Sequence, residues 1–406
     1  GRSAEALLLG RIVCWWRSDP GLSALVPCGW CDRAGGIVAQ LSGAAVLIIA
    51  CISSHGFGHG ARVAAVLHAV HARRPDCRFI LSTALPQEFV ARSFAGLPLQ
   101  HRLCRWDVGV IQADALGSDS EATLAALDQL DAELPDLVER ESAWIAAQRQ
   151  NGEAALVLAD IPPAAALLAQ RLELPLIWHG NFGWDSIYGA MGPCFSNWSQ
   201  QCLMRYRQGQ ALLSCPFSLP MNWGLPVYEL GLSCATPGIE AEWLRQRLGW
   251  RTSRDRSALL CFGGLGLSCN SAWLESWPDW RFLVLDPQLV QAGNALLVPE
   301  DLRPLDVMPL CDLVITKPGY STFCEALRQQ CGLVVVQREG FAEAAVLEQL
   351  LPRYGRHRFI SRGQFDCGDW GLDQALHSPD GLPLPVGGEE QAAEFLLHKL
   401  EAAVCT

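Results

Sequence analysis

The sequence predicts an α/β protein with two domains, each built on a parallel sheet that helices cover on both faces. Short apolar runs rich in β-branched residues alternate with helical patterns from Gly43 onward, as in consecutive βαβ units. At 406 residues the chain is longer than one hydrophobic core usually serves. The pattern breaks at a proline-rich passage between Pro216 and Pro237, the best candidate for a linker, and then restarts.

The two halves of the pattern have the same plan. In the first, strands are predicted over residues 44–52, 77–83, 154–160 and 174–180, and helices over 86–94 and 120–150. In the second, strands are predicted over 257–262, 281–286, 310–316 and 332–337, and a last helix over 388–402. Each half opens with a strand, a glycine-rich turn and a helix. We therefore expect two Rossmann-like domains that face a cleft.

The domain boundaries follow from where the pattern starts and breaks. Residues 1–42 show no sustained period and no clean signal-peptide layout, and we expect an N-terminal extension outside the ordered fold. Residues 43–235 are assigned to the first domain and 236–406 to the second. The last helix is expected to be able to pack back on the first domain.

The composition favours a compact protein of a reduced compartment. Half of the residues are hydrophobic and 18% are charged, so cores are well supplied. A net charge of −11 without any Lys/Arg-rich run argues against nucleic-acid binding. The 17 cysteines lie scattered in apolar runs and are expected as small core residues. Cys28 and Cys31 form a C-x-x-C motif, and we favour chance spacing over a redox role as its explanation. No apolar run is long enough to span a membrane, and we expect a cytoplasmic protein.

The turn after the first strand carries an unusual pair of histidines. Its sequence is Ser-His-Gly-Phe-Gly-His-Gly over residues 54–60, directly before an apolar helix. Glycines let the backbone pass close to a ligand, and the helix N-terminus directs N–H groups at an anion or polar group. Folding alone explains His55 and His59 less well than a functional site does.

The most informative stretch of the second half runs from Thr316 to Glu325. A strand again ends in a small-residue turn and a new helix, so Ser321 and Thr322 can cap the helix or donate to a phosphate. Glu325 falls one turn into that helix, where its carboxylate either accepts two ribose hydroxyls or complements the helix N-terminus. Lys317 either counters phosphate charge or is a surface lysine.

These stretches together resemble the GT-B glycosyltransferases of the MurG-like kind. The resemblance is closer still to the glycosyltransferase-like half of plant L-arabinokinases and bacterial relatives, and it covers about residues 44–360. It rests on the histidine turn, on Gly263-Gly264 and on Lys317-Pro318-Gly319-Tyr320-x-Thr322-x-x-Glu325. Further matches are Gln112-x-Asp114, Asn181-Phe182-x-Trp184-Asp185-x-Ile187-Tyr188, Asp306-Val307-Met308 and Arg338-Glu339-x-Phe341-x-Glu343.

The resemblance implies a glycosyltransferase that moves a sugar from a nucleotide-sugar donor to an acceptor hydroxyl with inversion of configuration. From the family, the expected donor is a UDP-sugar. It implies no metal and no cofactor. His59 would be the general base in the cleft. The implied donor-binding residues are Gly263, Gly264, Lys317, Gly319, Ser321, Thr322, Glu325, Arg338, Glu339 and Glu343. The implied acceptor-side residues are Gly58, Asp114, Asn181 and Asp185.

Several alternatives stay open at this point. The turn departs from the family's glycine loop, so His55 is a second candidate base, although His59 is preferred. Asp114, Asp160 and Asp185 could orient a histidine or bind an acceptor, but solvated caps are the commoner explanation. Arg62 reaches the cleft or simply covers its helix.

Two other functions compete with the transferase. One is a GT-B sugar-nucleotide epimerase, which would need carboxylates such as Glu339 and Glu343 around the donor sugar. The other is a catalytically silent nucleotide-sugar-binding module. The acceptor is not identified: a lipid-linked acceptor with peripheral membrane contact is one option, but the tryptophans form no amphipathic stripe.

Overall fold

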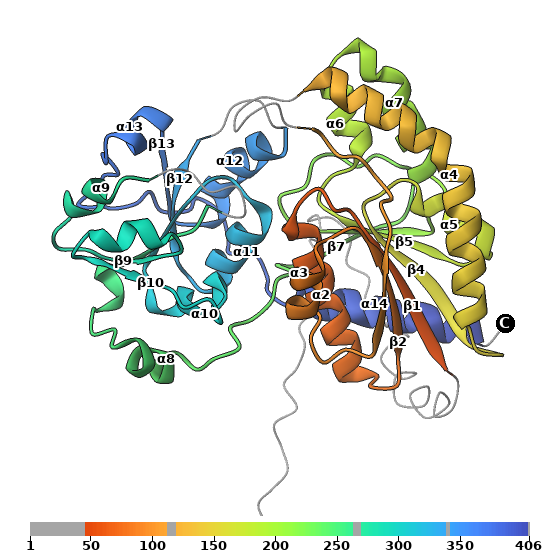
Figure 1. Ribbon diagram of the computed structural model, residues 1–406, viewed down its shortest axis with the longest axis horizontal. Helices are drawn as coiled ribbons and strands as arrows, with labels where there is room; N and C mark the ends of the chain where they lie inside the picture. The colour runs from red at the N-terminus through yellow and green to blue at the C-terminus, as the bar shows by residue number, and fades with distance from the viewer. Residues whose placement is uncertain (1–44, 112–118, 263–268, 338–341, 405–406) are drawn as a thin grey trace, which may run out of the picture. The chain divides into compact units, whose positions relative to one another are not determined.

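Two parallel sheets organise the chain. The computed structural model describes residues 45–111, 119–262, 269–337 and 342–404 (Figure 1). The predicted glycines Gly263 and Gly264, and also Asp114, Arg338 and Glu339, lie outside these described residues. Both sheets are of the predicted Rossmann-like kind, with all neighbouring strands parallel.

The first sheet has seven strands in the order β3-β2-β1-β4-β5-β6-β7. The strands are β1 (Val46–Ile52), β2 (Arg78–Thr83), β3 (Leu99–Leu103), β4 (Ala154–Asp160), β5 (Leu176–Gly180), β6 (Ala211–Ser214) and β7 (Val227–Glu229). The helices of this part are α2 (Phe57–Arg73), α3 (Gln87–Ser93), α4 (Ser120–Gln148), α5 (Ala165–Leu172), α6 (Trp184–Ala190) and α7 (Ser196–Tyr206). The sequence indicated that the proline-rich passage is a linker. Because β7 pairs with β6, this passage also contains the edge strand of the first sheet.

Side-chain alternation along the strands separates the two faces of the first sheet. In β1, Ile48 and Ala50 face a core formed with α2 and α3, while Leu47 and Ile49 face a core formed with α4 to α7. This two-residue period is what the pleat of a strand imposes. Every residue of β1 is buried, as expected for a central strand of a parallel sheet.

The second sheet has six strands in the order β10-β9-β8-β11-β12-β13. These are β8 (Ser257–Leu260), β9 (Arg281–Val284), β10 (Ala295–Leu297), β11 (Leu313–Thr316), β12 (Gly332–Val336) and β13 (His357–Ile360). Its helices are α8 (Ala241–Leu248), α9 (Ser271–Glu275), α10 (Pro304–Val307), α11 (Tyr320–Arg328), α12 (Ala342–Tyr354) and α13 (Arg362–Asp366). The helices α8, α10, α11 and α12 share a core with one face, and α9 and α13 with the other.

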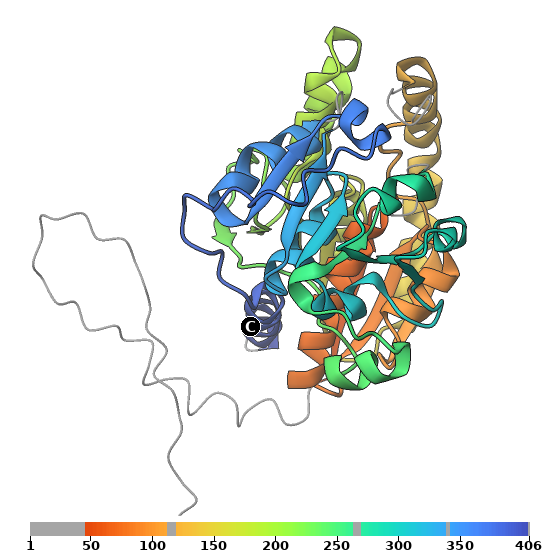
Figure 2. The same cartoon turned by 90° about the vertical axis from the view of Figure 1, so that its left-hand side faces the viewer.

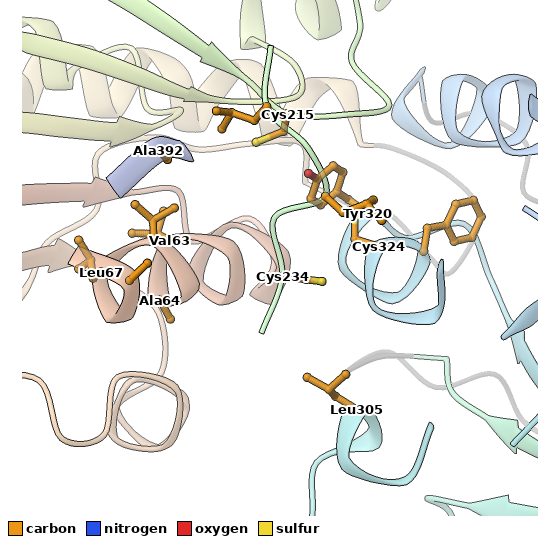
Figure 3. Packing of buried hydrophobic residues seen from close by; sticks show 14 of the residues in the cluster. Val63, Ala64, Leu67, Cys215, Cys234, Leu305, Tyr320, Cys324 and Ala392 are labelled. Carbon is orange, nitrogen blue, oxygen red and sulfur yellow. The ribbon is translucent and has the colours of Figure 1, made fainter. Parts of the chain in front are cut away.

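The last helix, α14 (Gly388–Val404), leaves the second domain and packs against the first. It contacts α2 and β4, and both views show it beside α2 (Figures 1 and 2). Close by, Ala392 lies next to Val63 and Leu67 of α2 (Figure 3). The two passages of chain between the domains also run side by side, because Leu232 N–H donates to the carbonyl of Pro385 at 2.7 Å.

Strand order places the functional turns. In each sheet the order reverses between two central strands, β1 and β4 in the first and β8 and β11 in the second. Open parallel sheets bind ligands beyond the carboxyl ends of the strands at such a reversal. The histidine turn follows β1, and the Lys317–Tyr320 turn follows β11, so both predicted turns occupy a reversal point.

The cysteines of the described residues have free thiols, and most are buried. None of the helices within the described ranges has both the length and the apolar character needed to cross a bilayer.

Packing of α14 predicts how the stability of the chain responds to truncation of one side chain. Leu396 is fully buried in the core that α14 shares with α2, so Leu396→Ala should lower the free energy of unfolding by about 2–5 kcal/mol. Chemical denaturation measures the change. The control is Glu394→Ala. The Glu394 side chain is 76% exposed and its carboxylate lies 3.7 Å from Arg73. Because exposed ion pairs contribute little, this substitution should change stability by less than about 0.5 kcal/mol. Equal effects of the two substitutions would contradict the packing described.

Candidate functional site

The carboxylate of Asp160 is the centre of a buried polar cluster at the reversal point of the first sheet. Asp160 ends β4, and its side chain is completely buried. Each of its oxygens accepts two hydrogen bonds: Arg62 Nη2 (2.6 Å) and His59 Nδ1 (2.8 Å) contact Oδ1, while Arg62 Nε (2.6 Å) and His179 Nδ1 (2.8 Å) contact Oδ2. The interpretation of Asp160 as a solvated cap is therefore wrong, and the alternative, that it orients a histidine, is correct.

Arg62 compensates the buried charge. It is 2% exposed, in the second turn of α2, and its guanidinium forms a two-pronged pair with Asp160. Burial would raise the pKa of Asp160, but Arg62 and the hydrogen bonds from His179 and His59 outweigh it and hold that pKa well below its ordinary value. Asp160 is thus ionised at neutral pH. Arg62 does not simply cover its helix.

The partners of His59 fix its tautomer. Since Asp160 only accepts hydrogen bonds, the 2.8 Å contact assigns a proton to Nδ1 of His59. Arg62 Nη2 also lies 3.1 Å from Nδ1, but a protonated Nδ1 has no free lone pair to accept from it, and Nη2 donates to Asp160 at 2.6 Å. The neutral imidazole then carries its lone pair on Nε2. A histidine held in this way can accept a proton from a hydroxyl group.

His55 has the opposite arrangement. The backbone N–H of Val110 donates to Nδ1 of His55 at 3.4 Å, and the ring meets the edge of Trp184 with centroids 5.1 Å apart. The preceding residue, Gly109, has a φ of +73°, and a Cβ at that position would collide with the His55 ring. With Nδ1 accepting, the proton of neutral His55 resides on Nε2. In this contact Nδ1 of His55 is an acceptor, whereas Nδ1 of His59 is a donor, and the choice of His59 as the base stays a prediction.

Two further residues of the cluster were not predicted. His179 is the penultimate residue of β5, and its Nε2 lies 3.4 Å from Sγ of Cys215, which follows β6. Burial opposes protonation of His179, but Cys215 and Asp160 outweigh it and raise its pKa to about 9. Burial likewise raises the pKa of Cys215, yet His179 lowers it overall. For His179 the available signal was position, because it lies near the carboxyl end of the predicted strand 174–180.

The N-terminus of α11 contacts the histidine turn. Ser321 Oγ donates to the carbonyl of Gly58 at 3.5 Å, and a Cβ on Gly58 would stand 3.1 Å from that oxygen. Tyr320 lies over Arg62, with the guanidinium carbon 4.8 Å from the ring centroid. The predicted donor turn and the predicted base thus meet at two helix N-termini.

The other predicted donor residues have different surroundings. Gly319, Lys317 and Thr322 are half-buried around the start of α11. Burial raises the pKa of Glu325 to about 7, with Arg303 lowering it and Asp306 raising it. Glu343, in the first turn of α12, accepts from Nδ2 of Asn181 at 3.2 Å and so joins an acceptor-side prediction to a donor-side one.

Asp185 stands apart from the histidine cluster. It lies in the first turn of α6, where Oδ2 accepts from Nε1 of Trp223 at 3.1 Å and Oδ1 is buried with no hydrogen-bond partner among the described residues. Burial raises the pKa of this carboxyl, against the hydrogen bond from Trp223. Its acceptor-side role stays a prediction.

The chain is similar in sequence to a curated protein and in fold to several solved structures. No protein-family model matches the sequence. The chain is 27% identical over 357 residues to the L-arabinokinase of Arabidopsis thaliana, which is 85% of this chain and 33% of that protein. The chain therefore spans about a third of the length of this curated relative.

Several solved structures have a similar fold, and two of those described next contain a nucleotide sugar. UGT2 of Phytolacca americana, complexed with UDP-2fluoro-glucose and pterostilbene, is 15% identical, covers 89% of this chain and 94% of its own, and has a TM-score of 0.57. UGT89C1 of Arabidopsis thaliana, complexed with UDP-L-rhamnose, is 11% identical, covers 89% and 99%, and has a TM-score of 0.59. CalG4, the calicheamicin glycosyltransferase, gives a TM-score of 0.55 at 13% identity, covering 89% and 95%. The predicted GT-B fold is confirmed, while the MurG-like subtype stays a prediction.

The buried pair predicts a contrast between two aspartates. Asp160→Asn leaves the charge of Arg62 buried without its partner and should lower the free energy of unfolding at pH 7 by about 3–5 kcal/mol. Because the folded pKa of Asp160 is depressed, this stabilisation is present above its ordinary pKa of about 3.9 and is lost as the pH falls toward the folded value. Denaturant titrations at pH 7 and at about pH 3, below the ordinary pKa of an aspartate, measure it.

The control for this prediction is Asp185→Asn. The raised pKa of Asp185 means that its charge opposes folding, so the amide should leave stability at pH 7 unchanged or higher. A loss at position 185 as large as that at position 160 would contradict the assignment of these environments.

Proposed function

We propose that the chain is a glycosyltransferase that moves a sugar from a nucleotide-sugar donor to an acceptor hydroxyl, with His59 as general base. The observation that carries the proposal is the His59–Asp160 pair at 2.8 Å, held where the N-terminus of α2 contacts the N-terminus of α11. The fold of UDP-sugar-bound structures supports it.

The base acts through the nitrogen that Asp160 leaves with a lone pair. Nε2 of His59 takes the proton of the acceptor hydroxyl as its oxygen attacks the anomeric carbon. The bond from that carbon to the diphosphate breaks on the opposite side, so the configuration inverts. Asp160 stays ionised and stabilises the imidazolium that forms.

The donor would bind along the second domain. The N-terminus of α11, with Ser321 and Thr322, would face the diphosphate, whose negative charge the helix dipole stabilises as the bond breaks. Glu325 would accept the ribose hydroxyls, and Glu343 would contact the glycosyl group. The proposed step needs no metal and no cofactor. A uridine base is the proposal that the similar structures favour.

A silent nucleotide-sugar-binding module is the second candidate. It is favoured by the similarity to a protein named for a kinase activity, of which this chain spans about a third. An epimerase would use Glu343 and other carboxylates at the donor sugar and remains the rival among enzymes.

The deciding experiment combines binding with turnover. Thermal stabilisation is measured with a panel of nucleotide sugars, and release of free nucleotide is then measured with candidate acceptors. Stabilisation with acceptor-dependent release supports the transferase, whereas stabilisation without release favours the silent module. Interconversion of the nucleotide sugar without release would indicate an epimerase. The absence of any stabilisation would refute all three.

Replacing the base should separate chemistry from binding. His59→Ala is expected to reduce kcat by about 10²–10⁴-fold while the donor dissociation constant stays within about twofold, because His59 acts on the acceptor proton. Steady-state kinetics and calorimetric titration measure the two quantities. The matched control is His55→Ala in the same turn, which should reduce kcat by less than His59→Ala does. A larger effect at His55 would reverse the assignment of the base.

The raised pKa of Glu325 predicts a pH dependence of donor affinity. Ribose hydroxyls donate best to the ionised carboxylate, so affinity for the donor should rise between pH 6 and pH 8, through the value of about 7. Calorimetric titration at both pH values tests this, and Glu325→Gln should weaken binding and flatten its pH dependence.

The same substitution changes stability with a definite sign. Because the folded pKa of Glu325 is raised, ionisation opposes folding, and the stability present at low pH is lost as the pH rises toward 7. Glu325→Gln without ligand should therefore raise the melting temperature, more at pH 8 than at pH 6. A lower melting temperature at pH 8 would contradict the desolvated environment.

A further inference from the structure

A chain of hydrogen bonds links the first turn of α12 in the second domain to the ring of His59. Glu343 accepts from Nδ2 of Asn181 at 3.2 Å, and Oδ1 of Asn181 accepts from Nη1 of Arg62 at 2.6 Å. Arg62 then donates twice to Asp160, which accepts from His59. The first link joins the two domains, and the remaining links are buried within the first domain.

The donor and acceptor roles along this series of hydrogen bonds require an amide between Glu343 and Arg62. Arg62 can only donate and an ionised Glu343 can only accept, so the residue between them must accept on one side and donate on the other. Asn181 does both, and its remaining contact, with the carbonyl of Phe217 at 3.4 Å, again uses the amide N–H. The contacts therefore fix the orientation of the Asn181 side chain.

Arg62 also contacts a second residue of the second domain, Tyr320. The ring of Tyr320, the first residue of α11, lies 4.8 Å from its guanidinium carbon. Figure 3 shows Tyr320 in the apolar cluster together with Cys215 of the first domain. In such surroundings, hydrogen bonds to a charged group are stronger than in water, and moving one member disturbs its neighbours. All three donor nitrogens of the Arg62 guanidinium are engaged in the network.

We propose that Asn181 and Arg62 are positioning residues that couple the carboxylate of Glu343 to the ring of His59. This inference rests on the proposed function for its purpose: the glycosyl hydroxyls of a nucleotide sugar would compete with Asn181 for Glu343. Binding of the sugar, and not of the nucleoside diphosphate alone, would then change the hydrogen bonds that hold the base.

Reversal of polarity provides the test. Asn181→Asp keeps an oxygen for Arg62 but turns a second acceptor toward Glu343, so the link should break. Glu343→Gln alone keeps an acceptor for Asn181 and should preserve the link. In the double variant, the new amide at position 343 can donate to the new carboxylate at position 181, so the link should form again with its polarity reversed.

The measurement is the ¹⁵N spectrum of the histidine rings in the ligand-free protein, with His59 identified by the signal that His59→Gln removes. We expect Asn181→Asp to shift the ring signals of His59, Glu343→Gln to leave them near their wild-type positions, and the double variant to restore them. Glu343→Leu removes the acceptor at a partly exposed site and should shift the signals as Asn181→Asp does; it replaces that variant if Asn181→Asp does not fold.

Arg328→Met supplies the matched control. It removes another contact between the domains, the ion pair of Arg328 with Glu389, which has no part in the chain to His59. This control should leave the His59 signals unchanged. The proposal is overturned if the double variant keeps the shift of Asn181→Asp, or if Glu343→Leu moves nothing. The measurement needs no turnover, so failure of the proposed function, seen as no binding of any nucleotide sugar, is a separate result.

Discussion

The buried pair of Arg62 and Asp160 is the interaction on which the rest of the site depends. A carboxylate without any exposure is stable only because a guanidinium neutralises it and every lone pair is used. That requirement brings two strand ends, one loop and one helix together: β4 supplies Asp160, β5 supplies His179, the loop after β5 supplies Asn181, and α2 supplies Arg62 with His59. The orientation of both histidines is a consequence of satisfying one charge.

The second domain contributes to the same cluster without adding another buried ion pair to it. Tyr320 covers Arg62 with an aromatic face, and Glu343 reaches it through a neutral amide. One apolar core continues across both sheets around these groups, from Ile48 in β1 to Val314 in β11. The low polarity of this core makes each hydrogen bond in the cluster stronger and each missing partner more costly. Glu343 and His59 are therefore held by one network.

The sequence was sufficient to predict much of the fold, because the central strands are long, apolar and bounded by turn residues. β1, β4 and β5 are of this kind and begin or end within two residues of their predicted limits. The strands that escaped prediction were peripheral or short. β3 is half-exposed and reads Leu-Gln-His-Arg-Leu, and β7 has three exposed residues after Pro226, so neither has a buried strand's composition.

The site was less predictable, for a physical reason. The sequence marks His59 because it stands in a glycine-rich turn, but its partner Asp160 lies 101 residues away along the chain. His179 contacts the other oxygen of Asp160. An aspartate at a strand end is equally compatible with a solvated cap, and only burial beside Arg62 decides between the two. Cys215 follows β6, a strand that was not predicted, so its approach to His179 could not be anticipated.

The return of α14 to the first domain has a consequence for the order in which the molecule forms during synthesis. Val63 and Leu67 of α2 pack beside a helix that begins at Gly388, so the whole second domain is made before this face of the first can be covered. On the ribosome, the first sheet therefore waits with an uncovered apolar surface while some 150 residues emerge, for about 10–30 s at ordinary rates of elongation. A chaperone that binds exposed apolar surfaces would bind the nascent first domain during this interval.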